Sequence, residues 1–286
     1  MSDLVLRKTM RVSGDSVNMA MELRTSQLFL LFQEAAGDHA IRLGLGQPYL
    51  MEHNRTWVVA LMDVRIDRLP RYDDTIAVET WPGRFKHIIC PRYYQLRILP
   101  KTEDERLLHP DGEVSVRASS VWSILDVEKR VAVNPVAEGL VSDPDDWLFS
   151  EEEADPDVRE TMAMKRPRAL KPGNMDHRSD FTVPFGFVDM NGHMNNARYL
   201  DLAENLLFAE PLKEQGASFR VPALSRVEME YRAEILGGET IPVLWGEETR
   251  PENDSGESDS ADNGRAFYFQ GGGENPAFRM RLTYRE

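Results

Sequence analysis

Apolar and polar residues in the first half of the chain follow first a helical pattern and then an alternating one. From Leu28 to Ala40 apolar side chains recur at helical spacing, which predicts a helix that Thr25 or Ser26 can cap and that ends near Gly44. Strand-like runs lie on both sides of this helix. The predicted strands of this half are Leu4–Val12, Thr56–Asp67, Thr75–Trp81, His87–Leu99 and Glu113–Leu125.

The second half repeats this order of elements. The short strand-like run Phe181–Phe187 leads to a helical pattern over about residues 196–210, with Tyr199 and Leu202 on its apolar face. Later strands are predicted at Ala223–Arg232, Thr240–Glu247, Ala266–Gln270 and Ala277–Tyr284.

Two short segments also match between the halves. Residues 74–78 (DTIAV) and 239–243 (ETIPV) both follow an alternating strand, and they run into Trp81 and Trp245 respectively. A duplicated strand–helix–strands unit is the simplest explanation. Chance agreement is the alternative, because many α+β chains carry such runs.

Two charged segments lack an apolar pattern. Residues 142–178 start acidic and turn basic, which predicts a linker that crosses the surface. Residues 251–265 are acidic and rich in Ser, Asp and Gly, which predicts a mobile hairpin loop. For both segments we expect solvation to be the role of the charges.

Three polar side chains alternate directly before the second predicted helix: Asp189, Asn191 and His193. In an extended segment alternate side chains point to the same side, so these three are expected to face one small volume. A carboxylate, a carboxamide and an imidazole are the groups that acyl-group hydrolysis needs.

A purely structural role is the alternative for each polar residue of this motif. Asp189 can be a turn residue, because Asn191-Gly192 is a common turn pair, and His193 can be structural. Asn195 or Asn196 is better explained as a helix N-cap than as a catalytic group.

Composition narrows the class of protein. The 286 residues have a formal net charge of -14 and are 41% hydrophobic, which argues against nucleic-acid binding and against attraction to anionic membranes. Cys90 is the single cysteine, so an internal disulfide is impossible. The first residues lack the apolar core of a signal peptide, and no apolar run is long enough to span a bilayer. We therefore expect a soluble, cytoplasmic protein.

No metal or cofactor is expected. Asp189 and Asn191 do not open a calcium loop, because Gly192 comes too early and Leu200 stands where the closing glutamate belongs. No His/Cys spacing suggests zinc. The glycines at 271–273 lack the strand–helix context of a phosphate loop and are interpreted as a turn.

The motif from Asp189 to Tyr199, with His193 and Asn195-Asn196 between them, closely resembles that of the acyl carrier protein (ACP) thioesterases of plants and bacteria. In that family it opens the helix of the second of two tandem hotdog domains. Other markers stand in the family's order along the first half, so the resemblance covers nearly the whole chain. They are Gln33–Ala36, Trp57–Val59, Arg68–Pro70, Thr80–Trp81 and Ser120–Trp122.

The resemblance implies an α+β fold of two tandem hotdog domains, each a long helix wrapped by a curved antiparallel sheet. The expected boundaries are 1–145 for the N-terminal domain, 146–178 for the linker and 179–286 for the C-terminal domain. The first domain would shape the acyl pocket and the second would supply catalysis. Candidate pocket residues, each better explained as ordinary core, are Leu31, Ala35, Trp57 and Val59.

The resemblance also adds Glu234 to Asp189, Asn191 and His193 as a catalytic candidate. Where the family has a cysteine next to this glutamate, the chain has Ile235, so a carboxylate-based hydrolysis fits better than a thiol nucleophile. Asp189 can attack the thioester or act as a base on water, and Glu234 can activate the water. His193 can orient water or donate to the carbonyl oxygen, and Asn191 can donate to the oxyanion. The sequence does not assign which carboxylate attacks.

The implied function is hydrolysis of fatty acyl-ACP to free fatty acid and holo-ACP. Alternatives are an acyl-CoA thioesterase on the same scaffold and a non-catalytic acyl-binding protein. ACP is acidic, so its docking would need a local basic patch. Possible contributors are Arg84, Lys86, Lys165, Arg166, Arg168 and Lys171. Two tandem hotdogs can form a pseudo-dimer, so both a monomer and a homodimer are compatible with the sequence.

Overall fold

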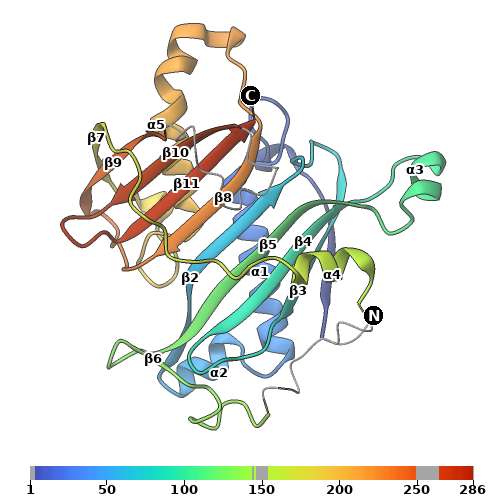
Figure 1. Ribbon diagram of the computed structural model, residues 1–286, viewed down its shortest axis with the longest axis vertical. Coiled ribbons are helices and arrows are strands. Elements are labelled where there is room, and N and C mark those ends of the chain that lie inside the picture. Colours follow the sequence, from blue (N-terminus) through green and yellow to red (C-terminus); the bar gives the residue numbers. More distant parts are fainter. Residues whose placement is uncertain (1–3, 144, 146–153, 249–263, 286) are drawn as a thin grey trace, which may run out of the picture.

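Two long helices pack against one antiparallel sheet in the computed structural model of the chain (Figure 1). The structure describes residues 4–143, 145, 154–248 and 264–285. Helix α1 (Thr25–Arg42) belongs to the first half and helix α5 (Arg198–Gln215) to the second. Apolar side chains from both helices and from the sheet form one continuous core. The expected α+β class is confirmed.

The strands of the described residues form a single eleven-stranded sheet. Its order is β1-β3-β4-β5-β2-β8-β11-β10-β9-β7, with the short β6 paired to β5. The first-half strands are β1 (Leu6–Arg11), β2 (Arg55–Ile66), β3 (Thr75–Pro82), β4 (Cys90–Ile98), β5 (Glu113–Asp126) and β6 (Val131–Val133). The second-half strands are β7 (His177–Thr182), β8 (Leu224–Tyr231), β9 (Thr240–Glu248), β10 (Gly264–Gly271) and β11 (Phe278–Arg285).

Strands β2 and β8 join the two halves, and their pairing sets the register between them. They run antiparallel from Leu61 opposite Glu230 to Arg65 opposite Arg226. The Arg226 guanidinium also donates from Nε and Nη2 to the two carboxylate oxygens of buried Asp63, at 2.9 Å each. A bidentate pair of this kind fixes direction as well as distance, so it reinforces the register of the seam.

Most predicted elements lie within a few residues of the observed ones, but two local expectations about them were wrong. The run Phe181–Phe187 is not one strand: β7 ends at Thr182, and a 3-10 turn, η3, covers Phe185–Phe187. Neither Thr25 nor Ser26 caps α1, because Arg24 is the N-cap residue. The Thr25 hydroxyl instead donates to Glu204 of α5 at 2.8 Å.

Part of the expected linker is built into the fold. Helix α4 (Pro156–Met162) lies on the sheet face opposite α1 (Figure 1). Val158 packs against Trp81 there, and Asp157 forms a 2.6 Å ion pair with Arg97. The expectation that these charges serve solvation was therefore wrong for this segment. Most of the loop predicted at 251–265 lies outside the described residues.

Several short elements carried no periodic pattern to predict them. Helix α3 (Glu103–Leu108) begins at a capping box in which Thr102 and Glu105 satisfy each other's backbone N–H groups. The remaining elements are α2 (Gln47–Glu52) and the 3-10 turns η1 (Gly14–Ser16) and η4 (Gly216–Ser218).

Glu204 lies at the contact between α1 and α5, where its environment gives a stability prediction. Burial raises the pKa of Glu204 to about 7, the Asp201 carboxylate adds to the rise, and the Thr25 hydroxyl opposes it. The folded chain therefore holds this proton more tightly than the unfolded chain does. Stability from this group is fully present below about pH 4.5 and falls as pH rises to about 7, by about 3 kcal/mol at most.

We expect Glu204→Gln, which mimics the protonated side chain, to raise the melting temperature at pH 8 by several degrees and to change it little near pH 5. The measurement is thermal unfolding at both pH values, with Glu214→Gln on the exposed face of the same helix as the control. An equal effect of Glu204→Gln at both pH values would contradict the assignment.

Candidate active site

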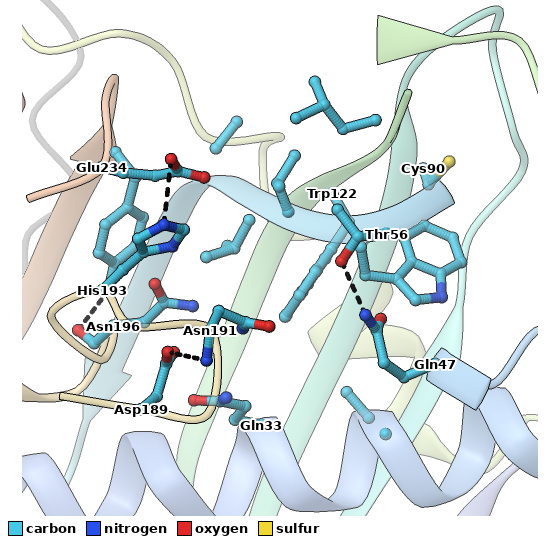
Figure 2. A pocket seen from close by; sticks show the side chains of 18 of the residues that line it. Gln33, Gln47, Thr56, Cys90, Trp122, Asp189, Asn191, His193, Asn196 and Glu234 are labelled. Atoms are coloured by element: carbon cyan, nitrogen blue, oxygen red, sulfur yellow. Dashed lines mark hydrogen bonds and ion pairs between the residues drawn. The ribbon is translucent and has the colours of Figure 1, made fainter. Parts of the chain in front are cut away.

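A cavity of about 960 Å³ lies between the two halves and contains the polar motif (Figure 2). Its first-half walls come from α1, α2, β2, β4, β5 and Pro82 at the end of β3. Its second-half walls come from the segment 189–196, the start of α5 and the end of β8 with the residues that follow it. Both halves of the chain thus supply walls of the same cavity.

The segment that carries Asp189, Asn191 and His193 is a tight turn and not the extended run that alternation predicted. The Gly192 N–H donates to the Asp189 carbonyl at 3.0 Å, and the Asp189 N–H donates to the His193 carbonyl at 2.9 Å. Gly192 has φ 80°, a left-handed conformation that glycine adopts without strain. All three side chains line the cavity, as expected. They reach it because the chain reverses in a turn, and not because an extended segment points alternate side chains to one side.

A hydrogen bond within this turn orients the Asp189 side chain. The Asp189 Oδ1 atom accepts from the backbone N–H of Asn191 at 2.9 Å, which is an Asx turn. This bond orients the Asp189 carboxylate and leaves its second oxygen for another partner. Asn191 is exposed and lines the cavity, so its amide is available to a bound molecule.

His193 and Glu234 face each other on the cavity wall. The His193 Nε2 atom lies 3.3 Å from Glu234 Oε2, and the side chains are 25% and 33% exposed (Figure 2). Backbone pairing holds them together: Met194 donates to the Ile235 carbonyl at 2.8 Å, and His193 bridges to Leu236. Glu234, which follows the end of β8 at Tyr231, therefore lies beside His193 of the motif.

Arg130 is a member of this site that the sequence did not indicate. Its Nη2 atom forms a short ion pair with Glu234 Oε2, the oxygen that also faces His193. Arg130 stands at the turn between β5 and β6 with φ 57°, an uncommon conformation for a residue other than glycine. The pair joins residues 104 positions apart, and no local pattern identifies such a contact.

The asparagines after the motif have structural partners. Asn195 Oδ1 accepts from the Ala197 N–H at 2.9 Å, in the turn before α5, whose N-cap residue is Ala197. Asn195 Nδ2 also approaches Gln33 of α1, at 3.5 Å. The Asn196 carbonyl accepts from the Tyr231 hydroxyl at 2.8 Å. These contacts are structural, but the expected N-cap role was wrong, because Ala197 is the N-cap residue of α5 and no side chain caps this helix.

Tyr199 lines the cavity close to the Asp189 and Glu234 carboxylates. Burial raises the pKa of Tyr199, and the Asp189 and Glu234 carboxylates raise it further. The phenol is therefore a neutral hydroxyl close to two carboxylates. Its ring meets Tyr231 and Phe278 edge-on, which fixes its orientation.

Only two of the four candidate pocket residues line the cavity. Trp57 and Val59 do, from β2. Leu31 and Ala35 do not: Ala35 is fully buried, and both side chains pack in the hydrophobic core. The face of α1 that carries Leu31 and Ala35 packs in the core, and an adjacent face of the helix lines the cavity. The α1 residues on the cavity wall are Gln33, Ala36, Gly37 and Ala40.

Cys90 lies closer to the site than its position in the sequence suggested. It is buried on β4 and lines the same cavity, at the end opposite Glu234 and His193 (Figure 2). Burial raises the pKa of the Cys90 thiol to about 12. At neutral pH the thiol is protonated and therefore a poor nucleophile, which agrees with a carboxylate-based reaction.

The basic residues considered for docking lie in two separate segments. Arg84 forms an ion pair with Asp145 at 2.7 Å, and Lys86 is exposed nearby in the hairpin between β3 and β4. Arg166, Arg168 and Lys171 are exposed on the linker, with Lys165 beside them.

The described residues contain no group of three or more His, Cys, Asp or Glu side chains arranged to hold a metal ion. None of the helices in this part of the chain is both long and apolar enough to cross a membrane.

Both halves of the chain match models of one protein family. Residues 3–142 match the acyl-ACP thioesterase N-terminal domain, and residues 170–266 match the acyl-ACP thioesterase C-terminal domain.

Curated relatives agree with these matches. A palmitoyl-ACP thioesterase of Cuphea hookeriana is 25% identical over 83% of this chain and 53% of its own length. A dodecanoyl-ACP hydrolase of Cinnamomum camphora is 25% identical over 84% of this chain and 59% of its own length. The chain spans about half the length of the curated relatives it matches.

Solved structures of similar shape confirm the predicted tandem hotdog fold. An acyl-ACP thioesterase from Bacteroides thetaiotaomicron superposes with a TM-score of 0.72 at 20% identity, and the match covers 100% of both chains. The 12:0-ACP thioesterase from Umbellularia californica has a TM-score of 0.69 at 20% identity, over 99% of this chain and 94% of that chain.

Proposed function

The chain belongs to the acyl-ACP thioesterase family, and we propose that it hydrolyses fatty acyl-ACP to free fatty acid and holo-ACP. The observation that carries this proposal is one cavity with two kinds of wall. First-half residues such as Trp57 and Val59 line it with apolar surface, while His193 and Glu234 face each other across its second-half wall. An acyl chain fits the first environment and its thioester the second.

We propose that water is the nucleophile and that His193 and Glu234 activate it together. With its Nε2–H donating to Glu234, neutral His193 carries an unprotonated Nδ1 that can accept a proton from water. The carboxylate then stabilises the imidazolium that forms, as in other carboxylate–histidine pairs. Water oxygen bonds to the thioester carbon, and the C–S bond breaks in the second step. The thiolate takes the proton from His193.

Asp189 and Asn191 are assigned supporting roles in this scheme. The Asn191 amide is exposed to the cavity and can donate to the oxyanion as the carbonyl oxygen gains charge. Asp189 has one oxygen held by the Asn191 N–H, so its carboxylate is better placed to orient water than to attack the carbonyl. Direct attack by Asp189 would pass through an anhydride and remains the alternative route.

Arg130 is proposed as a positioning residue for Glu234. It contacts the same carboxylate oxygen that faces His193, so it holds the Glu234 side chain in its orientation toward His193. Arg130 belongs to the first half of the chain, whereas His193 and Glu234 belong to the second. The proposed His193–Glu234 base therefore requires both halves.

We expect Glu234→Gln and His193→Gln each to lower kcat/KM for acyl-ACP about 10²- to 10⁴-fold, the range typical of a lost general base. Asn191→Ala should lower kcat about 10²- to 10³-fold with little change in KM, as for a lost oxyanion donor. The assay is release of free thiol from dodecanoyl-ACP. Asp180→Asn, on exposed β7, is the carboxylate control. If Asp189→Ala and Glu234→Ala both leave hydrolysis unchanged, the mechanism is wrong.

Substitutions in the basic segment of the linker test whether ACP docks there. We expect Arg166→Glu combined with Arg168→Glu to raise KM for dodecanoyl-ACP several-fold, because both side chains are exposed and ACP is acidic. The same variant should leave KM for dodecanoyl-CoA unchanged, and Lys213→Glu, on α5, should affect neither substrate. An unchanged KM for dodecanoyl-ACP would remove this segment from the docking surface. Faster hydrolysis of the CoA ester by the unaltered protein would favour the acyl-CoA alternative.

A further inference from the structure

A buried arginine lies in the cavity wall, away from the proposed catalytic groups. Arg92 is only 8% exposed and lines the cavity from β4. Its Nη1 donates to Thr80 Oγ1 at 3.2 Å and lies 3.1 Å from His39 Nδ1. Since arginine can only donate, His39 Nδ1 is the acceptor in this contact. Two neutral groups therefore hold one end of the guanidinium in place.

The charge of Arg92 has no carboxylate partner among the described residues. This is unusual, because a buried charge normally carries a large desolvation cost unless it is paired. The buried Arg97 of the same strand shows the usual arrangement, with ion pairs to Glu79 and Asp157. Burial also lowers the pKa of Arg92, which reflects the same cost.

Two nitrogens of Arg92 remain available to a ligand. Nε and Nη2 donate to no protein atom in the described part of the chain. Neither belongs to the fully enclosed polar atoms that lack a partner, so both still meet open space, and the open space that Arg92 lines is the cavity. By contrast, the Gln47 side-chain nitrogen, on the same cavity wall, already donates to Thr56 Oγ1 at 2.9 Å.

Arg92 lies at the end of the cavity remote from Glu234. Strands β5 and β2 separate β4 from β8, which places Arg92 roughly 14 Å across the sheet from β8. Along α1, Gln33 lies beside the catalytic turn, whereas Ala40 is roughly 10 Å further along the helix and adjoins His39, the partner of Arg92. Figure 2 shows Cys90, which is close to Arg92 on β4, opposite Glu234 and His193.

We propose that Arg92 binds an oxygen acceptor at the end of the acyl chain remote from the thioester. The preferred acyl groups then carry a hydroxyl or a carboxylate at that end, and Nε and Nη2 donate to it. A plain hydrocarbon end would leave the buried guanidinium without a partner, so unsubstituted chains of equal length bind less well. The inference rests on the proposed function for its acyl ligand, but the subsite itself is a property of the cavity wall.

Direct binding tests the subsite without any hydrolysis. The probes are the methyl esters of dodecanoic acid and 12-hydroxydodecanoic acid, and the monomethyl ester of dodecanedioic acid. Only the last has a free carboxylate, and that carboxylate stands at the remote end. Isothermal titration calorimetry should show both oxygenated esters binding about 10- to 100-fold more tightly than methyl dodecanoate, the range for a hydrogen bond to a charged group.

Variants assign this preference to Arg92. Arg92→Met should abolish it without weakening methyl dodecanoate, Arg92→Lys should keep part of it, and Cys90→Ala on the same wall should keep all of it. Equal affinities for the three esters in the unaltered protein would overturn the proposal, whether or not any variant folds. So would a loss in Arg92→Met that is equal for all three esters.

Hydrolysis separates this proposal from the proposed function. If dodecanoyl-ACP is hydrolysed faster than 12-hydroxydodecanoyl-ACP, the enzyme assignment stands and the subsite assignment fails. If no acyl-ACP is hydrolysed but the oxygenated esters bind more tightly, the subsite stands and the enzyme assignment fails.

Discussion

The pairing of β2 with β8 is the constraint on which the rest of the structure depends. A hotdog unit has a sheet edge that must be paired or covered, and here each half covers the edge of the other. A shift of one residue would turn every side chain of β8 to the opposite face. The observed register, reinforced by Asp63 and Arg226, directs the chain beyond β8 so that Glu234 reaches Arg130 and the first-half cavity.

Periodic segments could be predicted from the sequence because burial of one face imposes their pattern. The long helices and most strands lie close to their predicted positions for this reason. Alternation alone was misleading at Asp189–His193, where the turn propensity of Asn191-Gly192 prevailed. Helix α4 is short and charged, and its stability comes from tertiary contacts such as Asp157 with Arg97. A local pattern does not contain those contacts.

Some residues of the site could likewise be identified from the sequence, and others could not. The motif and Glu234 could be found through resemblance, and they do meet at one cavity wall. Arg130 could not, since only the seam between the halves brings it to Glu234. Leu31 and Ala35 were expected on the cavity wall because apolar helix positions look alike in sequence. Which positions meet the core and which meet the cavity depends on how α1 is rotated against the sheet.

Assembly of the proposed base from both halves is most directly tested by a double-mutant cycle. Arg130→Gln, Glu234→Gln and the double variant are compared by kcat/KM for dodecanoyl-ACP. If Arg130 acts through Glu234, Arg130→Gln alone lowers kcat/KM about 10- to 100-fold, whereas adding it to Glu234→Gln has almost no further effect. Losses that multiply in the double variant would show that the two side chains act independently, contrary to a base positioned across the seam.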